Sequence, residues 1–283
     1  MRVSATVAAV TGALALSALA VPAAQATGHG SLASLAPSTS KATPFTGSLP
    51  IGETVGDTKI TGVVVNGGKD IVVGTTVKKT FTISVSASDP TGIYDGYAAL
   101  WHGPNSEHPN STMTPDAEMG TCTATGATTG TCKVTVVADP NENIYSNILA
   151  GTWKVWVGAM GNDYDYTIED AYDTVQVQRA SKLTVNAAPE PVKKGKTVTV
   201  TGKLSRANWD DLQYHGYTNQ AVQLQFRKKN SNTYNTLKTI RSDSTGNLKT
   251  TTTATVDGYF RYSFVGTATT PAVKATGDYV DVQ

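Results

Sequence analysis

Apolar and polar residues alternate along several short stretches of this chain. In the first half, Phe81, Ile83 and Val85 are separated by single polar residues. Alternation with a period of two places one set of side chains in a core and the other in solvent, which is typical of a half-buried β-strand. The same pattern recurs at residues 132–136, 153–157, 222–226 and 260–264. The alternation therefore predicts an all-β protein.

Turn-forming sequences separate these stretches. Examples are Asn66-Gly67-Gly68, Asp89-Pro90-Thr91-Gly92 and Asp139-Pro140-Asn141. Short strands joined by such turns, without a convincing helix between them, indicate antiparallel sandwiches. We predict a first sandwich over residues 51–178 and a second over residues 181–283, joined by a short connection.

The first 50 residues differ from the rest. Residues 1–26 combine Arg2, an apolar run over residues 7–21 and the small-residue motif Ala24-Gln25-Ala26, which together predict a secretory signal peptide. Residues 27–50 are rich in Ser, Thr, Ala, Gly and Pro, and are predicted to form a flexible low-complexity tail. We therefore expect a secreted, extracellular protein.

Composition and charge narrow the classes of partner. The chain of 283 residues has 23 Lys and Arg against 22 Asp and Glu, so its formal net charge is +1. A near-neutral balance gives no electrostatic footprint for nucleic acid and no polybasic membrane anchor. We predict no nucleic-acid partner, and no membrane association after the signal peptide is removed.

The chain has two cysteines, Cys122 and Cys132. Secretion would carry them into an oxidising compartment, where paired cysteines persist as disulfides. The nine residues between them are small and prone to turns. We predict a structural disulfide that closes a hairpin.

Two groups of residues resemble known families. Residues 84–93 and 150–155 resemble strand and turn signatures of bacterial immunoglobulin-like modules. Residues 183–185, 196–202, 223–227 and 259–262 resemble the C-terminal domain of secreted Streptomyces-type actinobacterial proteins whose role is unassigned. The resemblance implies two immunoglobulin-like antiparallel β-sandwiches, and it implies no catalytic residue, because that family has no catalytic motif to transfer.

Catalytic motifs are otherwise sparse. The chain contains no G-x-S-x-G nucleophile elbow and no H-E-x-x-H zinc motif. A Ser-His-Asp triad is recognised by geometry rather than by sequence order. A hydrolase built on this chain would require His102, His108, His215 or a pair of carboxylates. We predict that the protein is not an enzyme.

One acidic stretch is a candidate calcium site. Calcium prefers six to eight oxygen ligands, and a segment dense in carboxylates can supply them. The candidate ligands are Asp163, Asp165, Glu169, Asp170 and Asp173. The alternative is a solvated loop, because Asp and Asn also favour turns. We predict no cofactor apart from this candidate calcium ion.

Aromatic residues cluster in one turn-rich stretch of the second sandwich. Exposed rings at Trp209, Tyr214 and Tyr217 would stack on sugar faces, and Asp210 would accept hydrogen bonds from sugar hydroxyls. Alternatively, these amphipathic rings close the end of the core. Trp153 and Trp156 lie on opposite faces of one strand, so one of them is predicted to be outside the core.

These observations predict a non-catalytic binding or structural protein that acts outside the cell through loops on β-sandwich modules. Its partner would be an extracellular protein or a cell-wall polysaccharide. The main alternative is a carbohydrate- or cell-wall-binding protein, with or without calcium dependence, followed by a secreted hydrolase or inhibitor.

Overall fold

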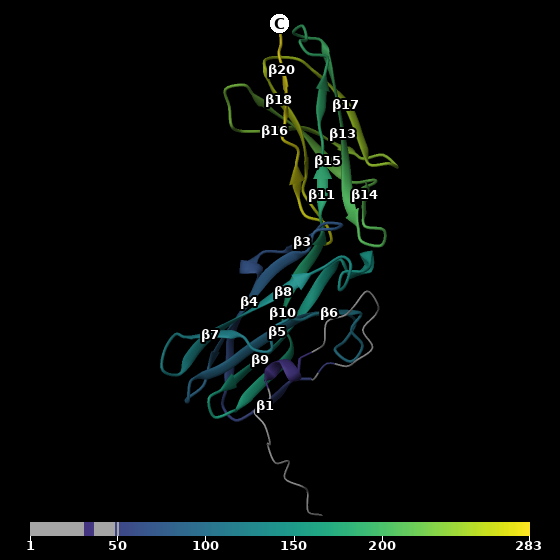
Figure 1. Ribbon diagram of the computed structural model, residues 1–283. Helices are drawn as coiled ribbons and strands as arrows, with labels where there is room; N and C mark the ends of the chain where they lie inside the picture. Colours follow the sequence, from purple (N-terminus) through teal and green to yellow (C-terminus); the bar gives the residue numbers. More distant parts are fainter. Residues whose placement is uncertain (1–30, 37–48, 50) are drawn as a thin grey trace, which may run out of the picture. The chain divides into compact units, whose positions relative to one another are not determined.

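The computed structural model describes residues 31–36, 49 and 51–283, and folds most of them into β-strands (Figure 1). The predicted signal peptide lies outside the described residues, as do residues 27–30, 37–48 and 50 of the predicted tail. The three helices among the described residues are single 3-10 turns, η1 (Leu32–Ser34), η2 (Asn66–Gly68) and η3 (Asn147–Leu149). In this part of the chain, no helix is long and apolar enough to cross a membrane.

The first sandwich contains ten strands. They are β1 (Glu53–Val55), β2 (Lys59–Val65), β3 (Ile71–Val73), β4 (Lys79–Ser88), β5 (Ile93–His102), β6 (Ser111–Met113), β7 (Thr121–Ala124), β8 (Thr129–Ala138), β9 (Gly151–Gly161) and β10 (Tyr166–Arg179). One sheet has the order β2-β4-β8-β7. The other has the order β1-β10-β9-β5-β6, and β3 pairs in parallel with β10.

This strand order is that of an immunoglobulin fold. With β2, β4, β8 and β7 as strands A, B, E and D, the first sheet has the order A-B-E-D. The second sheet then carries β10, β9 and β5 as G, F and C, with β6 as an additional strand beside C. The topology confirms the predicted immunoglobulin-like sandwich.

The predicted alternation forms the core of this sandwich. Phe81, Ile83 and Val85 on β4 are buried, as are Trp153 and Val155 on β9. One of Trp153 and Trp156 was predicted to lie outside the core, but Trp156 is buried as well as Trp153, because other segments cover that face of β9. Both sides of β9 are therefore shielded from solvent between Val155 and Gly161.

Part of the covering layer comes from the segment predicted as a flexible tail. Leu32, in η1, is fully buried in the first core. A Cβ atom on Gly158 of β9 would lie only 3.2 Å from Leu32 Cδ2, so glycine makes room for the leucine. Leu49 is also buried, and its backbone N–H donates to the Ser106 carbonyl (2.9 Å). The tail prediction is wrong for these residues, because their apolar side chains gain more from burial than the polar composition suggested.

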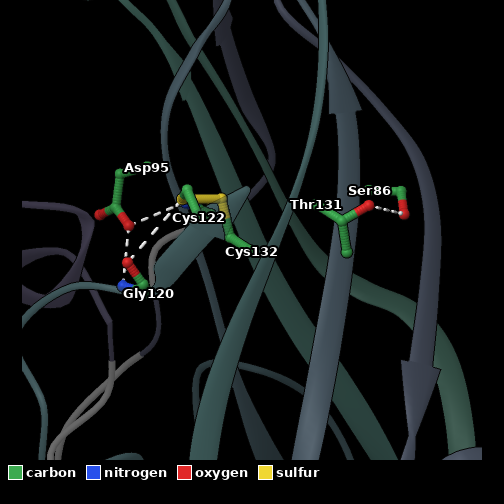
Figure 2. The surroundings of a disulfide bond; sticks show 7 residues. Ser86, Asp95, Gly120, Cys122, Thr131 and Cys132 are labelled. Carbon is green, nitrogen blue, oxygen red and sulfur yellow. Dashed lines mark hydrogen bonds between the residues drawn. A yellow bond between two sulfur atoms is a disulfide. The ribbon is translucent and has the colours of Figure 1, made fainter. Parts of the chain in front are cut away.

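The predicted disulfide is present. Cys122 on β7 and Cys132 on β8 face each other in register and are bonded (Figure 2). Gly120 lies beside them, and its N–H donates to the Asp95 carboxylate (2.9 Å). A Cβ atom at residue 120 would lie 2.2 Å from the Gly96 carbonyl oxygen, so only glycine allows this close approach.

The second sandwich also contains ten strands. They are β11 (Ser181–Leu183), β12 (Asn186–Ala188), β13 (Thr197–Asn208), β14 (Gln213–Gly216), β15 (Ala221–Lys228), β16 (Asn235–Arg241), β17 (Asn247–Thr253), β18 (Gly258–Phe264), β19 (Val273–Lys274) and β20 (Asp278–Val280). In one sheet, β11, β12, β14 and β17 all pair with β13. In the other, β15 lies between β16 and β18, and β18 pairs with β19 and β20. The inward residues form a second core that includes Val222, Leu224, Phe260 and Tyr262.

Candidate functional site

The residues predicted to bind a sugar do not form an open surface. Trp209 is 1% exposed and belongs to the core of the first sandwich, although it follows β13 of the second. Its Nε1 donates to the Gly74 carbonyl (3.0 Å), and its backbone N–H donates to Asn147 Oδ1 (2.9 Å). The prediction that Trp209 is a stacking platform is therefore wrong, because contacts with the first sandwich bury its ring.

Two neighbours of Trp209 belong to the same junction. The Asp210 carboxylate accepts a hydrogen bond from the Asn147 backbone N–H (3.1 Å). Tyr214 is half-buried against the first core, with Lys182 Nζ 3.7 Å from its ring centroid. Tyr217 instead packs within the second sandwich, edge-on against Phe264 at 5.7 Å between ring centroids. Trp209, Asp210 and Tyr214 are therefore part of a structural joint, and Tyr217 is part of the second core.

A half-buried arginine strengthens this joint. Arg179 ends β10, and its Nε donates to the Ala207 carbonyl (2.6 Å). Burial, together with the nearby charge of Arg206, lowers the pKa of Arg179 to about 10. The guanidinium remains charged at neutral pH, and holds the end of β13 against the end of the first sandwich.

The five predicted calcium ligands are not brought together. Asp163 and Asp165 lie in the turn between β9 and β10, whereas Glu169, Asp170 and Asp173 lie along β10. Tyr166, next to Asp165, pairs with Met160, and Asp173 pairs with Val155, so five residues of β9 at about 3.3 Å each, or roughly 16 Å, separate the two ends of the acidic stretch. Across residues 31–36, 49 and 51–283, no group of three or more His, Cys, Asp or Glu side chains could hold a metal ion.

Asp165 instead belongs to a hydrogen-bonded turn cluster. Its Oδ2 accepts from the Asp57 backbone N–H (3.3 Å), and the neighbouring Thr58 hydroxyl donates to Asp89 Oδ2 (2.6 Å). Burial tends to raise the pKa of Asp89, but hydrogen bonds from Thr58 and Thr91 outweigh it and hold that pKa below its ordinary value. These carboxylates fasten the turns at one end of the sandwich.

The histidines do not form a catalytic triad in the described part of the chain. His215 Nε2 lies 2.6 Å from Asp211 Oδ2 on an exposed hairpin. His102 is half-buried, and burial lowers its pKa with help from Lys154. Within the described ranges, no serine or cysteine side chain hydrogen-bonds to either ring.

A different surface of the second sandwich carries a dense set of aromatic and cationic side chains. The alternation that turns Val222, Leu224 and the half-buried Phe226 toward the core turns the intervening residues of β15 outward. The same alternation on β18 turns Tyr259 and Arg261 outward, and Tyr279 lies opposite Tyr259 on β20. We call the set Arg227, Tyr234, Tyr259, Arg261 and Tyr279 the tyrosine–arginine face.

These side chains stack on one another across three strands and a loop. The Tyr259 and Tyr279 rings are 5.1 Å apart between centroids. Arg227 Cζ lies 3.8 Å from the Tyr259 centroid and 5.4 Å from that of Tyr234. Arg261 Cζ lies 3.6 Å from the Tyr234 centroid, so Tyr234 contacts both guanidinium groups. Cation–π contacts of this kind hold planar groups in fixed orientations.

Polar residues extend the face on both sides. Arg261 Nε donates to Gln225 Oε1 (2.9 Å), and Gln225 Nε2 donates to Gln223 Oε1 (3.1 Å). At the other end, Lys229 Nζ lies 5.3 Å from the Tyr279 ring centroid. The pKa of Lys229 is raised by Tyr279 and by Asp257. All five members of the tyrosine–arginine face remain partly exposed, so they are accessible to a ligand.

The sequence predicts part of this face, because the alternation that places some residues in the core also places their neighbours on the outer surface. Tyr259-Phe260-Arg261-Tyr262 marks Phe260 and Tyr262 as core, and the same alternation marks Tyr259 and Arg261 as outward neighbours. Their partners Arg227 and Tyr279 are some 20 to 30 residues away in sequence, so the pairing register was needed to join them.

Comparisons with known proteins give no family for the chain. No protein-family model matches it, and no curated protein matches it significantly. Among solved structures, the D00-D0 domain of intimin is 12% identical, with a TM-score of 0.25, and the match covers 77% of this chain and 98% of that one. Titin domains Z1Z2, in complex with telethonin, are 9% identical, with a TM-score of 0.21, covering 82% of this chain and 98% of that one.

A third similar structure is Salmonella alpha-2-macroglobulin reacted with methylamine, at 12% identity and a TM-score of 0.29. The match covers 86% of this chain but only 16% of that protein. The strand order, rather than any of these likenesses, establishes the immunoglobulin-like fold of the first sandwich.

Proposed function

We propose that this protein is a non-catalytic, extracellular binding module that holds a carbohydrate polymer on the tyrosine–arginine face. The single observation that carries the proposal is the continuous ladder of three tyrosine rings and two guanidinium groups on one sheet. Aromatic rings cover the apolar faces of sugars, while neighbouring amides and guanidinium groups hydrogen-bond to sugar hydroxyls.

The composition of the face favours a polar polymer over a protein partner. Protein interfaces have an apolar centre depleted in charge, surrounded by a polar rim. Here, Gln223, Gln225 and Arg261 occupy the middle of the sheet, and its outward positions carry no aliphatic side chain larger than alanine between Ala221 and Arg227. A hydrated glycan matches this mixture of rings and hydrogen-bonding groups.

An extracellular location is supported by three observations. The Cys122–Cys132 disulfide is of a type that persists in oxidising compartments. Residues 1–26 have the pattern of a secretory signal peptide. The second sandwich also resembles a domain of secreted actinobacterial proteins. Together they lead us to propose secretion from such a bacterium, with the cell wall or environmental polysaccharide as the ligand.

The test is retention of the purified protein on insoluble polysaccharides and purified cell walls. We expect retention on at least one solid, and a loss of tenfold or more in the double variant Tyr259→Ala, Tyr279→Ala. Tyr94→Ala is the matched control, because Tyr94 is a partly exposed tyrosine of the first sandwich. No retention of the wild-type protein on any solid, or equal retention of the double variant, would overturn the proposal.

A further inference from the structure

We propose that the glycan held by the tyrosine–arginine face is anionic, and that its carboxylate or phosphodiester groups pair with Arg227 and Arg261. This inference rests on the proposed function and adds the chemical class of the ligand. It is carried by the charge of the sheet, by the unused donors of the two guanidinium groups and by the distribution of charge along the chain.

Four of the five strands of this sheet carry no acidic residue. Strands β15, β16, β18 and β19 contain no Asp or Glu, whereas β20 contains Asp278. The basic residues of the four strands are Arg227, Lys228, Lys238, Arg241, Arg261 and Lys274. The Asp278 carboxylate accepts a hydrogen bond from the Ala187 backbone N–H (2.6 Å), and Asp257, next to β18, lies 3.7 Å from Lys229 and accepts a hydrogen bond from the Tyr279 hydroxyl. An anionic ligand would therefore meet positive charge without crossing a carboxylate on these four strands.

The two arginines keep most of their hydrogen-bonding capacity. A guanidinium has five N–H donors. Arg261 donates through Nε to Gln225, and Arg227 donates through one terminal nitrogen to the carbonyls of Lys229 and Ser231. Among the described residues, neither arginine forms an ion pair. The remaining donors suit the oxygens of a carboxylate or phosphate, which guanidinium groups bind in a bidentate fashion.

Stacking prepares these groups for binding. Arg227 lies between the Tyr259 and Tyr234 rings, and Arg261 lies against Tyr234. A ligand that pairs with a guanidinium already held by aromatic rings has less side-chain entropy to remove. The ladder therefore serves both parts of an acidic sugar, because the rings pack on its face and the arginines bind its charge.

The charge of the whole chain is divided between the two sandwiches. Residues 181–283 contain 14 Lys and Arg against seven Asp and Glu, whereas residues 51–178 contain six against 15. The net charge of +1 therefore conceals a basic second sandwich and an acidic first one. The acidic sandwich repels a polyanion and the basic one attracts it, which directs such a ligand to the second sandwich.

The experiment compares a polymer that carries free carboxylates with the same polymer after its carboxylates are esterified. Binding of the full chain is measured to polygalacturonate and to its fully methyl-esterified form, with glycerol teichoic acid as the phosphodiester polymer. We expect the protein to bind at least one anionic polymer tenfold or more tightly than the methyl ester. Raising the NaCl concentration from 50 to 500 mM should weaken that binding, because salt screens exposed charges.

The arginine variants identify the site. Arg227→Gln combined with Arg261→Gln should lose tenfold or more in affinity for the anionic polymer, and the corresponding double lysine variant should recover only part of it. The control is Lys203→Gln combined with Lys249→Gln, which removes two exposed charges from the β13–β17 sheet and should change affinity less than twofold. Thermal unfolding of each variant confirms that it is folded.

Four other results of these binding measurements would overturn part or all of the proposal. Equal, salt-insensitive binding of the charged and esterified polymers would overturn the anionic ligand and leave carbohydrate binding intact. Equal losses of affinity in the Arg227→Gln, Arg261→Gln variant and in the Lys203→Gln, Lys249→Gln control would show that the ligand does not bind at the tyrosine–arginine face. Binding of double-stranded DNA or anionic lipid vesicles as tightly as of the glycans would replace glycan recognition with general polyanion binding. Binding to no polysaccharide or cell wall would remove the proposed function itself.

Discussion

Trp209 illustrates how a single residue can be misjudged from its neighbours. It precedes Asp210 and Asp211, as an exposed turn residue would. Its ring is nevertheless buried by Gly74 and Asn147, which lie 135 and 62 residues earlier in the chain. Its burial is therefore decided by contacts that no local window of sequence contains.

The buried ring of Trp209 contributes to the stability of the fold. Trp209→Ala should lower the free energy of unfolding by about 3–5 kcal/mol, as is typical for removal of a buried tryptophan. Denaturant unfolding measures the change, and retention on the glycan should survive wherever the variant is folded. A variant with wild-type stability and no retention would instead show that Trp209 contacts the ligand.

Asp95 gives a prediction about pH. It is fully buried on β5, and its Oδ1 accepts from the backbone N–H groups of Gly96 (2.8 Å) and Gly120 (2.9 Å). Its Oδ2 is buried without a hydrogen-bond partner among the described residues. Burial raises the pKa of Asp95 above its ordinary 3.8, although the backbone amides of Gly120, Gly96 and Leu32 oppose the shift.

Because the pKa of Asp95 is raised on folding, its contribution to stability decreases as the pH rises. The folded protein binds this proton more tightly than the unfolded chain, so the contribution of Asp95 to stability is full below pH 3.8 and is lost as the pH rises through the folded pKa. Asp95→Asn should therefore gain stability relative to the wild type as the pH rises from 4 to 7. A constant difference between the two unfolding free energies across this range would contradict the account.

At the scale of elements, short segments are held by long-range contacts. Helix η1 has three residues, too few to be stable alone, and is held by Leu32 in the first core. Leu32→Ala should lower the free energy of unfolding by about 2–4 kcal/mol, which denaturant unfolding can measure. Leu35→Ala, at a 38% exposed neighbour, is the control. An unchanged free energy of unfolding in Leu32→Ala would contradict this packing and support the original prediction of a flexible tail.

The hairpin β7–β8 is held by its disulfide. The bond closes a loop with a sequence separation of 10 residues. Replacing Cys122 and Cys132 by alanine should cost about 2–3 kcal/mol of stability, because the unfolded chain regains the freedom of that loop. Retention on the glycan should be unchanged, since the tyrosine–arginine face lies in the other sandwich. A selective loss of retention in a folded variant would place ligand contacts near the disulfide.

For the molecule as a whole, alternation was sufficient to predict the β-class, and the two cysteines with a turn-prone segment between them were sufficient to predict the hairpin disulfide. Those features depend on residues close in sequence or on a period of two. The tyrosine–arginine face could not be predicted in the same way, because Arg227, Tyr259 and Tyr279 meet only through the register of three strands. The buried Leu32 and Trp209 were missed for a related reason, since their partners are distant in the chain.

Hydroxyl-radical footprinting of the tyrosines, with and without the retained glycan, tests whether the tyrosine–arginine face holds the ligand. We expect Tyr234, Tyr259 and Tyr279 to be protected on binding. Tyr94 and Tyr164 of the first sandwich, which are 36% and 41% exposed, should react equally in both states. Protection of Tyr94 and Tyr164, with Tyr234, Tyr259 and Tyr279 unchanged, would place the ligand on the first sandwich and contradict the account.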